Sequence, residues 1–123
     1  MRIVAVVMLA LTVALPSAAQ DLARGRRVFT RCIACHSLDP ASGPMPGPSL
    51  IGVVGRRAAS LPDFEYSTVL IEAGRSGLVW TEDVLDRFLT DTESYLRGTV
   101  MGLLRLPDPA DRAALIAYLK GAK

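Results

Sequence analysis

Cys32-Ile33-Ala34-Cys35-His36 is the stretch of sequence that decides the fold, because it holds both cysteines and the only histidine of the 123 residues. Two thiols separated by two residues and followed at once by an imidazole form C-x-x-C-H, the attachment signature of a c-type haem. On a helical turn this spacing lets the thiols reach two neighbouring vinyl groups of a porphyrin, while the imidazole points under the ring. The motif predicts one haem c per chain, covalently held by Cys32 and Cys35, with His36 as an axial iron ligand.

Three other interpretations of the motif stay open, but each has less support in the surrounding sequence. A redox-active dithiol is expected in a βαβ context, and no strand pattern is visible in this chain. A closed structural zinc site needs four ligands, whereas two cysteines and one histidine supply three. The two cysteines of an exported protein could also form a disulfide. Haem attachment is therefore the favoured interpretation.

Composition limits the classes of function. The length fits one domain, and 14 basic residues against 12 acidic ones leave a formal net charge of +2. A nucleic-acid binder is expected to carry a clustered basic face, so this balance argues against that class. We expect no nucleic-acid partner.

The N-terminus has the layout of a secretory signal peptide. Met1 and Arg2 form a short positive start, residues 3–15 are almost entirely apolar, and small residues end at Ala19. An uncleaved membrane anchor is the alternative, but the apolar run is shorter than the ~20 residues that a transmembrane helix needs. The sequence thus predicts a signal peptide over residues 1–19 and a soluble, exported, periplasmic domain over residues 20–123.

Hydrophobic spacing and capping residues predict an all-α fold with three main helices, one or two short helices and long Gly/Pro loops. Few apolar residues are available for so much loop, so the protein core is expected to be underfilled without the haem. The predicted helices are one capped by Asp21 and running to about Cys35, a short one within residues 64–73, one capped by Thr81, a single turn within residues 91–96, and one capped by Asp108 and ending at Gly121.

The second axial ligand follows from elimination. His36 is the only histidine, and a thioether is the usual partner of histidine in haem electron carriers. Met1 and Met8 would leave with the signal peptide, which leaves Met45 and Met101. Met45 lies nine residues after His36 in a rigid Pro/Gly loop, so Met101 is the better candidate for the opposite face of the haem.

The chain resembles the class I cytochromes c, in particular the short bacterial forms of the cytochrome c2 and mitochondrial-like branch. The resemblance covers residues 20–123 and implies the cytochrome c fold wrapped around the haem. The motifs that carry it are, in chain order, Gly25 and Phe29, the Cys32–His36 motif, Gly47-Pro48-Ser49-Leu50, Gly52-Val53-Val54-Gly55-Arg56, Tyr66, Val79-Trp80, Tyr95-Leu96, Gly98-Thr99-Val100-Met101, and Leu115-Ile116-Ala117-Tyr118-Leu119.

The resemblance also implies roles for individual residues. The backbone carbonyl of Pro48 would accept a hydrogen bond from the ring of His36. Gly25 and Phe29 would pack against Leu115 and Tyr118 where the first and last helices cross. The residues that would hydrogen-bond the haem propionates, directly or through water, are Arg56, Tyr66, Trp80 and Thr99.

The predicted function is that of a single-haem electron carrier, not an enzyme, with His36 and Met101 as axial ligands. A monomer would dock transiently with redox proteins such as an oxidase, reductase or dehydrogenase, through an apolar patch around Leu103 rimmed by Arg27, Arg31 and Arg97. Two alternatives stay open. Loss of the Met101 bond would open the iron to small ligands, and the chain could be a dedicated subunit of a larger complex.

Overall fold

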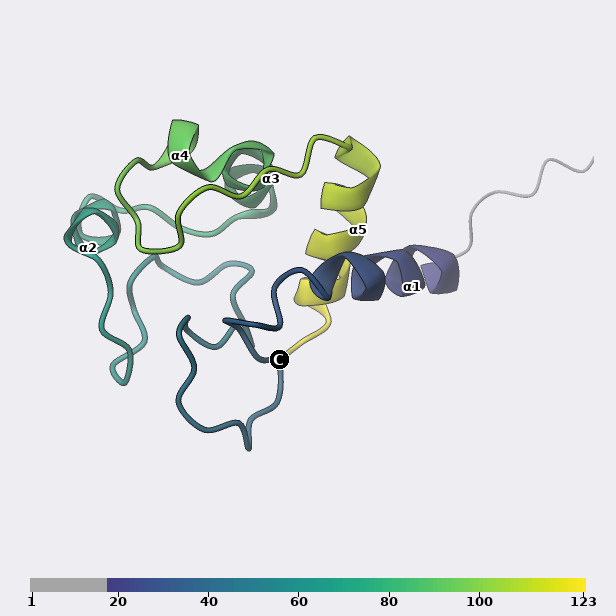
Figure 1. Cartoon of the computed structure of the whole chain (residues 1–123), viewed down its shortest axis with the longest axis horizontal. Helices are drawn as coiled ribbons and strands as arrows, with labels where there is room; N and C mark the ends of the chain where they lie inside the picture. The colour runs from purple at the N-terminus through teal and green to yellow at the C-terminus, as the bar shows by residue number, and fades with distance from the viewer. Residues whose placement is uncertain (1–17) are drawn as a thin grey trace, which may run out of the picture.

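The computed structural model describes residues 18–123 as helices joined by long loops (Figure 1). Extended pairing within this range is limited to one isolated bridge between Arg57 and Val79, so the expected all-α class is confirmed. The cut predicted after Ala19 falls in the first described residues, and residues 1–17 lie outside the description. The helices of the described range are α1 (Ala18–Phe29), α2 (Thr68–Arg75), α3 (Glu82–Thr90), α4 (Thr92–Tyr95) and α5 (Pro109–Lys120).

No helix in residues 18–123 combines the length and apolar character that a membrane crossing requires.

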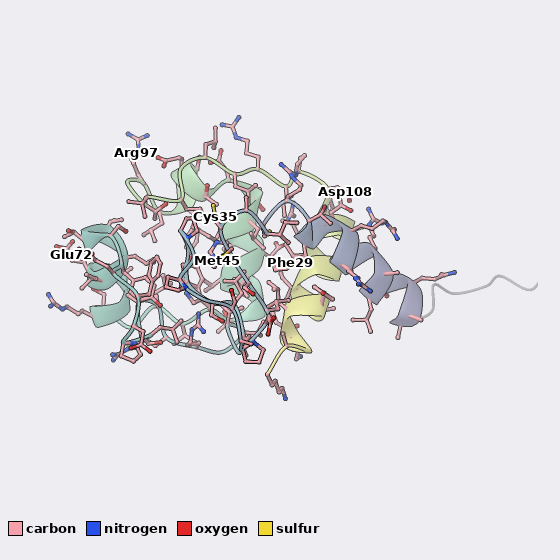
Figure 2. All side chains as sticks on the ribbon, turned by 60° about the horizontal axis from the view of Figure 1, so that its bottom comes forward. Phe29, Cys35, Met45, Glu72, Arg97 and Asp108 are labelled. Carbon is pink, nitrogen blue, oxygen red and sulfur yellow. The ribbon has the colours of Figure 1, made fainter. Side chains whose placement is uncertain are left out.

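The crossing of α1 and α5 joins the two ends of the described chain (Figure 1). Gly25 is buried at the crossing, and a Cβ atom there would collide with the Ala114 carbonyl and lie 2.7 Å from the Cβ of Tyr118. The rings of Phe29 and Tyr118 pack with their centroids 5.7 Å apart, and Figure 2 shows Phe29 between the two helices. The close approach expected at this glycine is therefore present.

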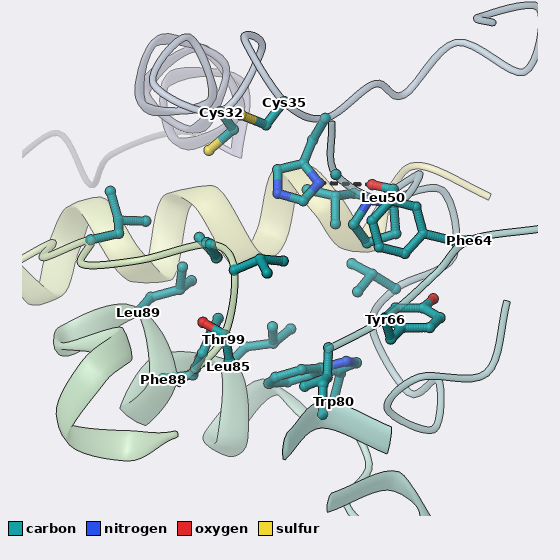
Figure 3. A pocket seen from close by; sticks show the side chains of 18 of the residues that line it. Cys32, Cys35, Leu50, Phe64, Tyr66, Trp80, Leu85, Phe88, Leu89 and Thr99 are labelled. Carbon is teal, nitrogen blue, oxygen red and sulfur yellow. Dashed lines mark hydrogen bonds between the residues drawn. The ribbon is translucent and has the colours of Figure 1, made fainter. Parts of the chain in front are cut away.

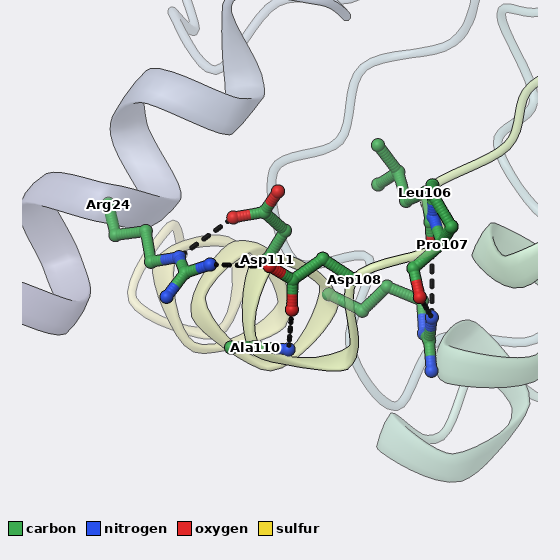
Figure 4. Close-up of polar contacts among 7 residues, drawn as sticks. Arg24, Leu106, Pro107, Asp108, Ala110 and Asp111 are labelled. Carbon is green, nitrogen blue, oxygen red and sulfur yellow. Dashed lines mark hydrogen bonds and ion pairs between the residues drawn. The ribbon is translucent and has the colours of Figure 1, made fainter.

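An ion-pair network covers the outer side of the same crossing (Figure 4). The Arg24 guanidinium donates to Asp111 at 2.7 Å and to Asp108 at 2.9 Å. All three side chains are at least one third exposed to solvent, and exposed pairs of this kind contribute little each. The packing around Gly25, rather than this network, therefore holds the two helices together.

The predicted N-caps at Thr81 and Asp108 are confirmed, whereas the one at Asp21 is wrong, because α1 already includes Ala18 and Asp21 lies in its first turn. Thr81 accepts a hydrogen bond from the Val84 amide at the start of α3, and Asp108 accepts one from the Ala110 amide at the start of α5. Asp91 caps α4 by accepting from the Ser94 amide. This hydrogen bond, followed by that from Arg105, lowers the pKa of the Asp91 carboxyl. These side chains satisfy backbone amides that a helix start leaves without partners.

The bounds of two predicted helices are wrong. The first helix ends at Phe29 instead of near Cys35, because Thr30, Arg31 and Cys32 bond to carbonyls three residues earlier and the chain winds into tight turns. The short helix expected within residues 64–73 begins only at Thr68 and continues to Arg75, past its expected end. Its N-cap, Ser67, has an extended backbone, which leaves residues 64–66 in a loop. Both changes move cavity-lining side chains out of helices.

The buried core lies between α1, α3 and α5. Its main contributors from α3 are Leu85, Phe88 and Leu89, which form the buried apolar stripe of that helix. The other buried hydrophobic residues of this cluster are Phe29, Val53, Ala58, Trp80, Leu106, Leu115, Ile116 and Leu119. This core borders a cavity on the side of the long loops.

Candidate haem site

A cavity of about 250 Å³ lies between the core and the loops, and apolar side chains form most of its wall (Figure 3). Its existence agrees with the underfilled core expected from the sequence. Both the helical side and the loop side contribute large hydrophobic residues. The nine site residues predicted from the sequence all line it: Cys32, Cys35, His36, Pro48, Arg56, Tyr66, Trp80, Thr99 and Met101.

The two cysteines enter the cavity from the turns that follow α1. Cys32 and Cys35 lie on one wall, and Trp80, Phe88 and Thr99 lie across from them (Figure 3). The two cysteines form no disulfide within residues 18–123, and the backbone holds the turn through the amides of Cys35 and His36, which donate to the Cys32 carbonyl. Burial raises the pKa of the Cys32 thiol, with a smaller opposing effect from Arg31.

His36 is held in one tautomer by the loop beneath it. Its Nδ1 lies 2.7 Å from the Pro48 carbonyl oxygen, and a carbonyl can only accept, so Nδ1 carries the proton. In the neutral imidazole this leaves the lone pair of Nε2 available to bind a metal ion. Gly47 allows this contact, because a Cβ at that position would come within 2.6 Å of the His36 ring.

The structure separates the two candidate methionines. Met101 lines the same cavity as His36. Met45 lines a different hollow, which the loops at residues 37–49 and 61–64 form. Met101 occupies a four-residue turn that the Gly102 amide closes by donating to the Thr99 carbonyl at 3.2 Å. Of the two methionines, only Met101 lines the cavity that His36 lines.

Polar groups gather at one part of the otherwise apolar wall. The Arg56 guanidinium donates to the backbone carbonyls of Ile51 and Ser49, at 3.0 Å each. Burial lowers its pKa, and Tyr66 opposes this effect. The Tyr66 hydroxyl accepts a hydrogen bond from the Leu61 amide, so its own proton stays available to another acceptor.

The hydroxyls of Ser67 and Thr99 indicate that the cavity accommodates a polar group. The Oγ of Ser67 and the Oγ1 of Thr99 are buried, and neither has a hydrogen-bond partner in residues 18–123. Both residues line the cavity. A buried hydroxyl without a partner costs free energy, so this pair fits a bound group that brings hydrogen-bond acceptors into the cavity.

The sequence interpretation missed Ser67. Serine directly after Tyr66 has no spacing or motif that sets it apart from any other serine before a helix. Its burial depends on how the loop at residues 60–67 packs against the rest of the cavity, which only the three-dimensional structure shows.

The cavity as a whole fits a haem. A large apolar wall suits the porphyrin, two thiols lie at one side, and an imidazole with a free Nε2 faces inward. Unpaired hydroxyls and a half-buried guanidinium suit the carboxylates of its propionates, whose burial is costly without donors. An apolar body with acidic side groups is therefore the chemistry that the lining residues accommodate.

The sequence and the fold both match known haem proteins, in agreement with a cavity that fits a haem. The family model for cytochrome c matches residues 22–123. Cytochrome c2 of Rhodopila globiformis is 42% identical over 104 residues, covering 84% of this chain and 94% of that protein. Cytochrome c2 of Afifella marina is 40% identical over 99 residues, with 80% of each chain covered. The structure of cytochrome c2 from Rhodospirillum centenum superposes with a TM-score of 0.77 at 35% identity, covering 84% of this chain and 98% of that one.

The chain belongs to the cytochrome c family, and its similarity is to the cytochromes c2. Its fold is the all-α cytochrome c fold. It carries covalently bound haem c and acts as an electron carrier with redox partners, not as an enzyme.

Proposed function

We propose that this protein holds one haem c with His36 and Met101 as the axial ligands and shuttles single electrons between redox proteins in the periplasm. The observation that carries the proposal is the shared cavity of His36 and Met101, in which the imidazole has its Nε2 free. When bound, the haem supplies an iron that alternates between Fe(II) and Fe(III), which is the one-electron change that a carrier needs.

Each residue that would hold the haem has a distinct task in this proposal. Cys32 and Cys35 anchor the haem through thioether bonds, which prevents its loss. Pro48 orients the imidazole of His36, as groups behind a metal ligand commonly do. Met101 contributes a thioether, which raises the reduction potential in this class of site. With both axial positions taken by the chain, no position is left for a substrate.

The polar part of the cavity would receive the propionates. Arg56 supplies a positive charge, and Tyr66, Trp80 and Thr99 supply hydrogen-bond donors. Ser67 joins this set because its buried hydroxyl lacks a partner in residues 18–123. Donors already fixed by the protein stabilise the carboxylates in a region that excludes water.

The docking surface we propose is the apolar rim around the turn that carries Met101. Val100 is 80% exposed and Leu103 59% exposed, and Ile33 beside the haem motif is 56% exposed. Arg97 extends outward on the same loop (Figure 2). Within residues 18–123, Arg97 and Arg27 form no ion pair, so both charges face solvent. A small rim of this kind suits the weak, transient contacts of electron-transfer partners.

Export through the signal peptide over residues 1–19 completes the proposal, because it would deliver residues 20–123 as a monomeric periplasmic carrier. The N-terminal residue of the purified protein tests the cleavage after Ala19. Sedimentation of the oxidised and reduced forms tests the monomeric state.

Ligation is tested by Met101→Ala, with Met45→Ala as the matched control. We expect M101A to keep its covalent haem, to lose the low-spin spectrum and the weak near-infrared sulfur-to-iron band, and to have a lower reduction potential, because water replaces a thioether that favours Fe(II). M45A should keep all three properties of the wild type. Retention of the near-infrared band in M101A, or its loss in M45A, would assign the ligand to another residue.

A further inference from the structure

The turn that carries Met101 belongs to a loop whose two ends lie side by side. The Leu106 amide donates to the Leu89 carbonyl at 2.9 Å, and the Thr92 amide donates to the Leu104 carbonyl at 3.1 Å. These two hydrogen bonds pair residues 89–92 with residues 104–106. Residues 93–103, which include most of α4 and Met101, form the segment that extends beyond this paired base.

Among the residues of this paired segment, Thr92 contacts the backbone next to Met101. Its side-chain hydroxyl donates to the Gly102 carbonyl at 2.8 Å and accepts from the Leu104 amide at 2.8 Å. Thr92 is fully buried, with 0% of its surface exposed. Gly102 in turn closes the Met101 turn through its amide. One hydroxyl thus holds the backbone on the C-terminal side of Met101 at two points.

The other side-chain contacts at this base lie farther from Met101. Arg105 pairs with Asp91 at 2.8 Å, but the arginine is 63% exposed, and exposed pairs contribute little. Arg112 donates to the carbonyls of Leu106 and Pro107 (Figure 4). Within residues 18–123, the side-chain hydrogen bonds to the backbone of residues 98–104 all come from Thr92.

We propose that Thr92 is a positioning residue, whose buried hydroxyl holds the Met101 turn closed and so limits how often Met101 leaves the iron. The inference rests on the proposed axial ligation by Met101. Opening of the turn would leave the Gly102 carbonyl and the Leu104 amide without their partner, which makes opening unfavourable. The protein would therefore resist foreign ligands through a residue that does not itself line the haem cavity.

Thr92→Val tests the proposal, because valine keeps the shape and removes the hydroxyl. Imidazole is the probe, since it binds ferric iron once Met101 has left. We expect its dissociation constant to fall by about tenfold or more in T92V, because one net hydrogen bond changes an equilibrium by about fivefold and two are lost. Thr92→Ser keeps the hydroxyl and should restore the wild-type value within about twofold.

Thr90→Val is the matched control, because the Thr90 hydroxyl is exposed and bonds only the Asp86 carbonyl of its own helix. T90V should bind imidazole as the wild type does. The proposal would be overturned if folded T92V kept the wild-type dissociation constant for imidazole. It would also be overturned if that constant fell as much in T90V or T92S as in T92V. If the wild type itself lacks the near-infrared band, Met101 is not the iron ligand, and this inference fails together with the proposed ligation. If the wild type shows the band but T92V binds imidazole with the wild-type dissociation constant, only the role of Thr92 is refuted.

A measurement on the wild type covers the case in which T92V does not fold. The Leu104 amide, bonded to the Thr92 hydroxyl, should exchange its hydrogen slowly, and saturating imidazole should speed that exchange at least fivefold. The Leu106 amide, bonded to Leu89 at the outer end of the base, should keep its rate. An unchanged Leu104 rate in imidazole would show that the contact stays closed when Met101 leaves, which overturns the proposal.

Discussion

Arg56 is the residue at which the cavity departs most from an ordinary hydrophobic core. Its guanidinium is half buried, and burial lowers its pKa, yet arginine stays protonated in proteins. Its hydrogen bonds go to the neutral carbonyls of Ser49 and Ile51 rather than to a carboxylate. Within residues 18–123 its charge has no carboxylate partner, and it lies beside a cavity that would receive two propionates.

This charge should influence the reduction potential. A cation near the haem disfavours the more positive Fe(III) state, so we expect Arg56→Gln to lower the potential, by an amount on the order of tens of millivolts for one charge at intermediate dielectric constant. Arg57→Gln is the control, because Arg57 is exposed and does not line the cavity. Redox titration of both variants provides the measurement. Equal shifts in the two variants would mean that overall charge, and not the position of Arg56, sets the effect.

At the scale of elements, the crossing of α1 and α5 depends on one glycine. Glycine in a helix interior costs about 1 kcal/mol relative to alanine. Here the missing side chain lets the α5 backbone at Ala114 approach α1 directly. The benefit of close packing over the whole crossing offsets the local cost, which no inspection of α1 alone would show.

Gly25→Ala should therefore destabilise the protein although it improves the helix propensity. The added methyl group meets the Ala114 carbonyl and the Cβ of Tyr118, so the helices must separate. We expect a net loss of about 2 kcal/mol in the free energy of unfolding, within the range for overpacked sites. Denaturant unfolding of the haem-bound protein checks this value. Gly43→Ala, with no atom within 4 Å of the new Cβ, should unfold like the wild type; equal stability of the two variants would contradict the crossing argument.

At the scale of the whole molecule, charge is nearly balanced, with a formal net charge of +2 over the full sequence. Several arginines are also paired with acids on the surface, including Arg24, Arg87 and Arg105. Such a molecule has little long-range field to attract a partner. Association should then depend on the exposed apolar rim and on the few unpaired charges near it.

We therefore expect electron-transfer rates to depend only modestly on salt. Oxidation of the reduced protein by anionic ferricyanide should slow by less than about tenfold between low and high ionic strength, because steering by net charge is weak. Arg97→Gln should reduce this dependence, whereas Arg75→Gln on α2 should leave it unchanged. Stopped-flow measurements across ionic strength test both statements. A steep decline that R97Q abolishes would instead indicate a concentrated basic docking face.

The sequence by itself determined the chemistry and much of the local structure. C-x-x-C-H requires only five adjacent residues, so haem attachment and the role of His36 can be predicted without a fold. The caps at Thr81 and Asp108 were predictable for the same reason, since a cap acts within one helical turn. Elimination also reduced the second ligand to Met45 or Met101, and the fold class followed from helical periodicity and the resemblance.

Only the tertiary structure decided which distant groups meet. The unpaired hydroxyl of Ser67 and the contact of Thr92 with Gly102 depend on packing between segments that sequence spacing does not relate. The end of α1 at Phe29 also escaped prediction, because helix propensity does not show where tight turns will bring the cysteines to the cavity. Local signals act over three or four residues, whereas burial and hydrogen-bond partners are set by the whole chain.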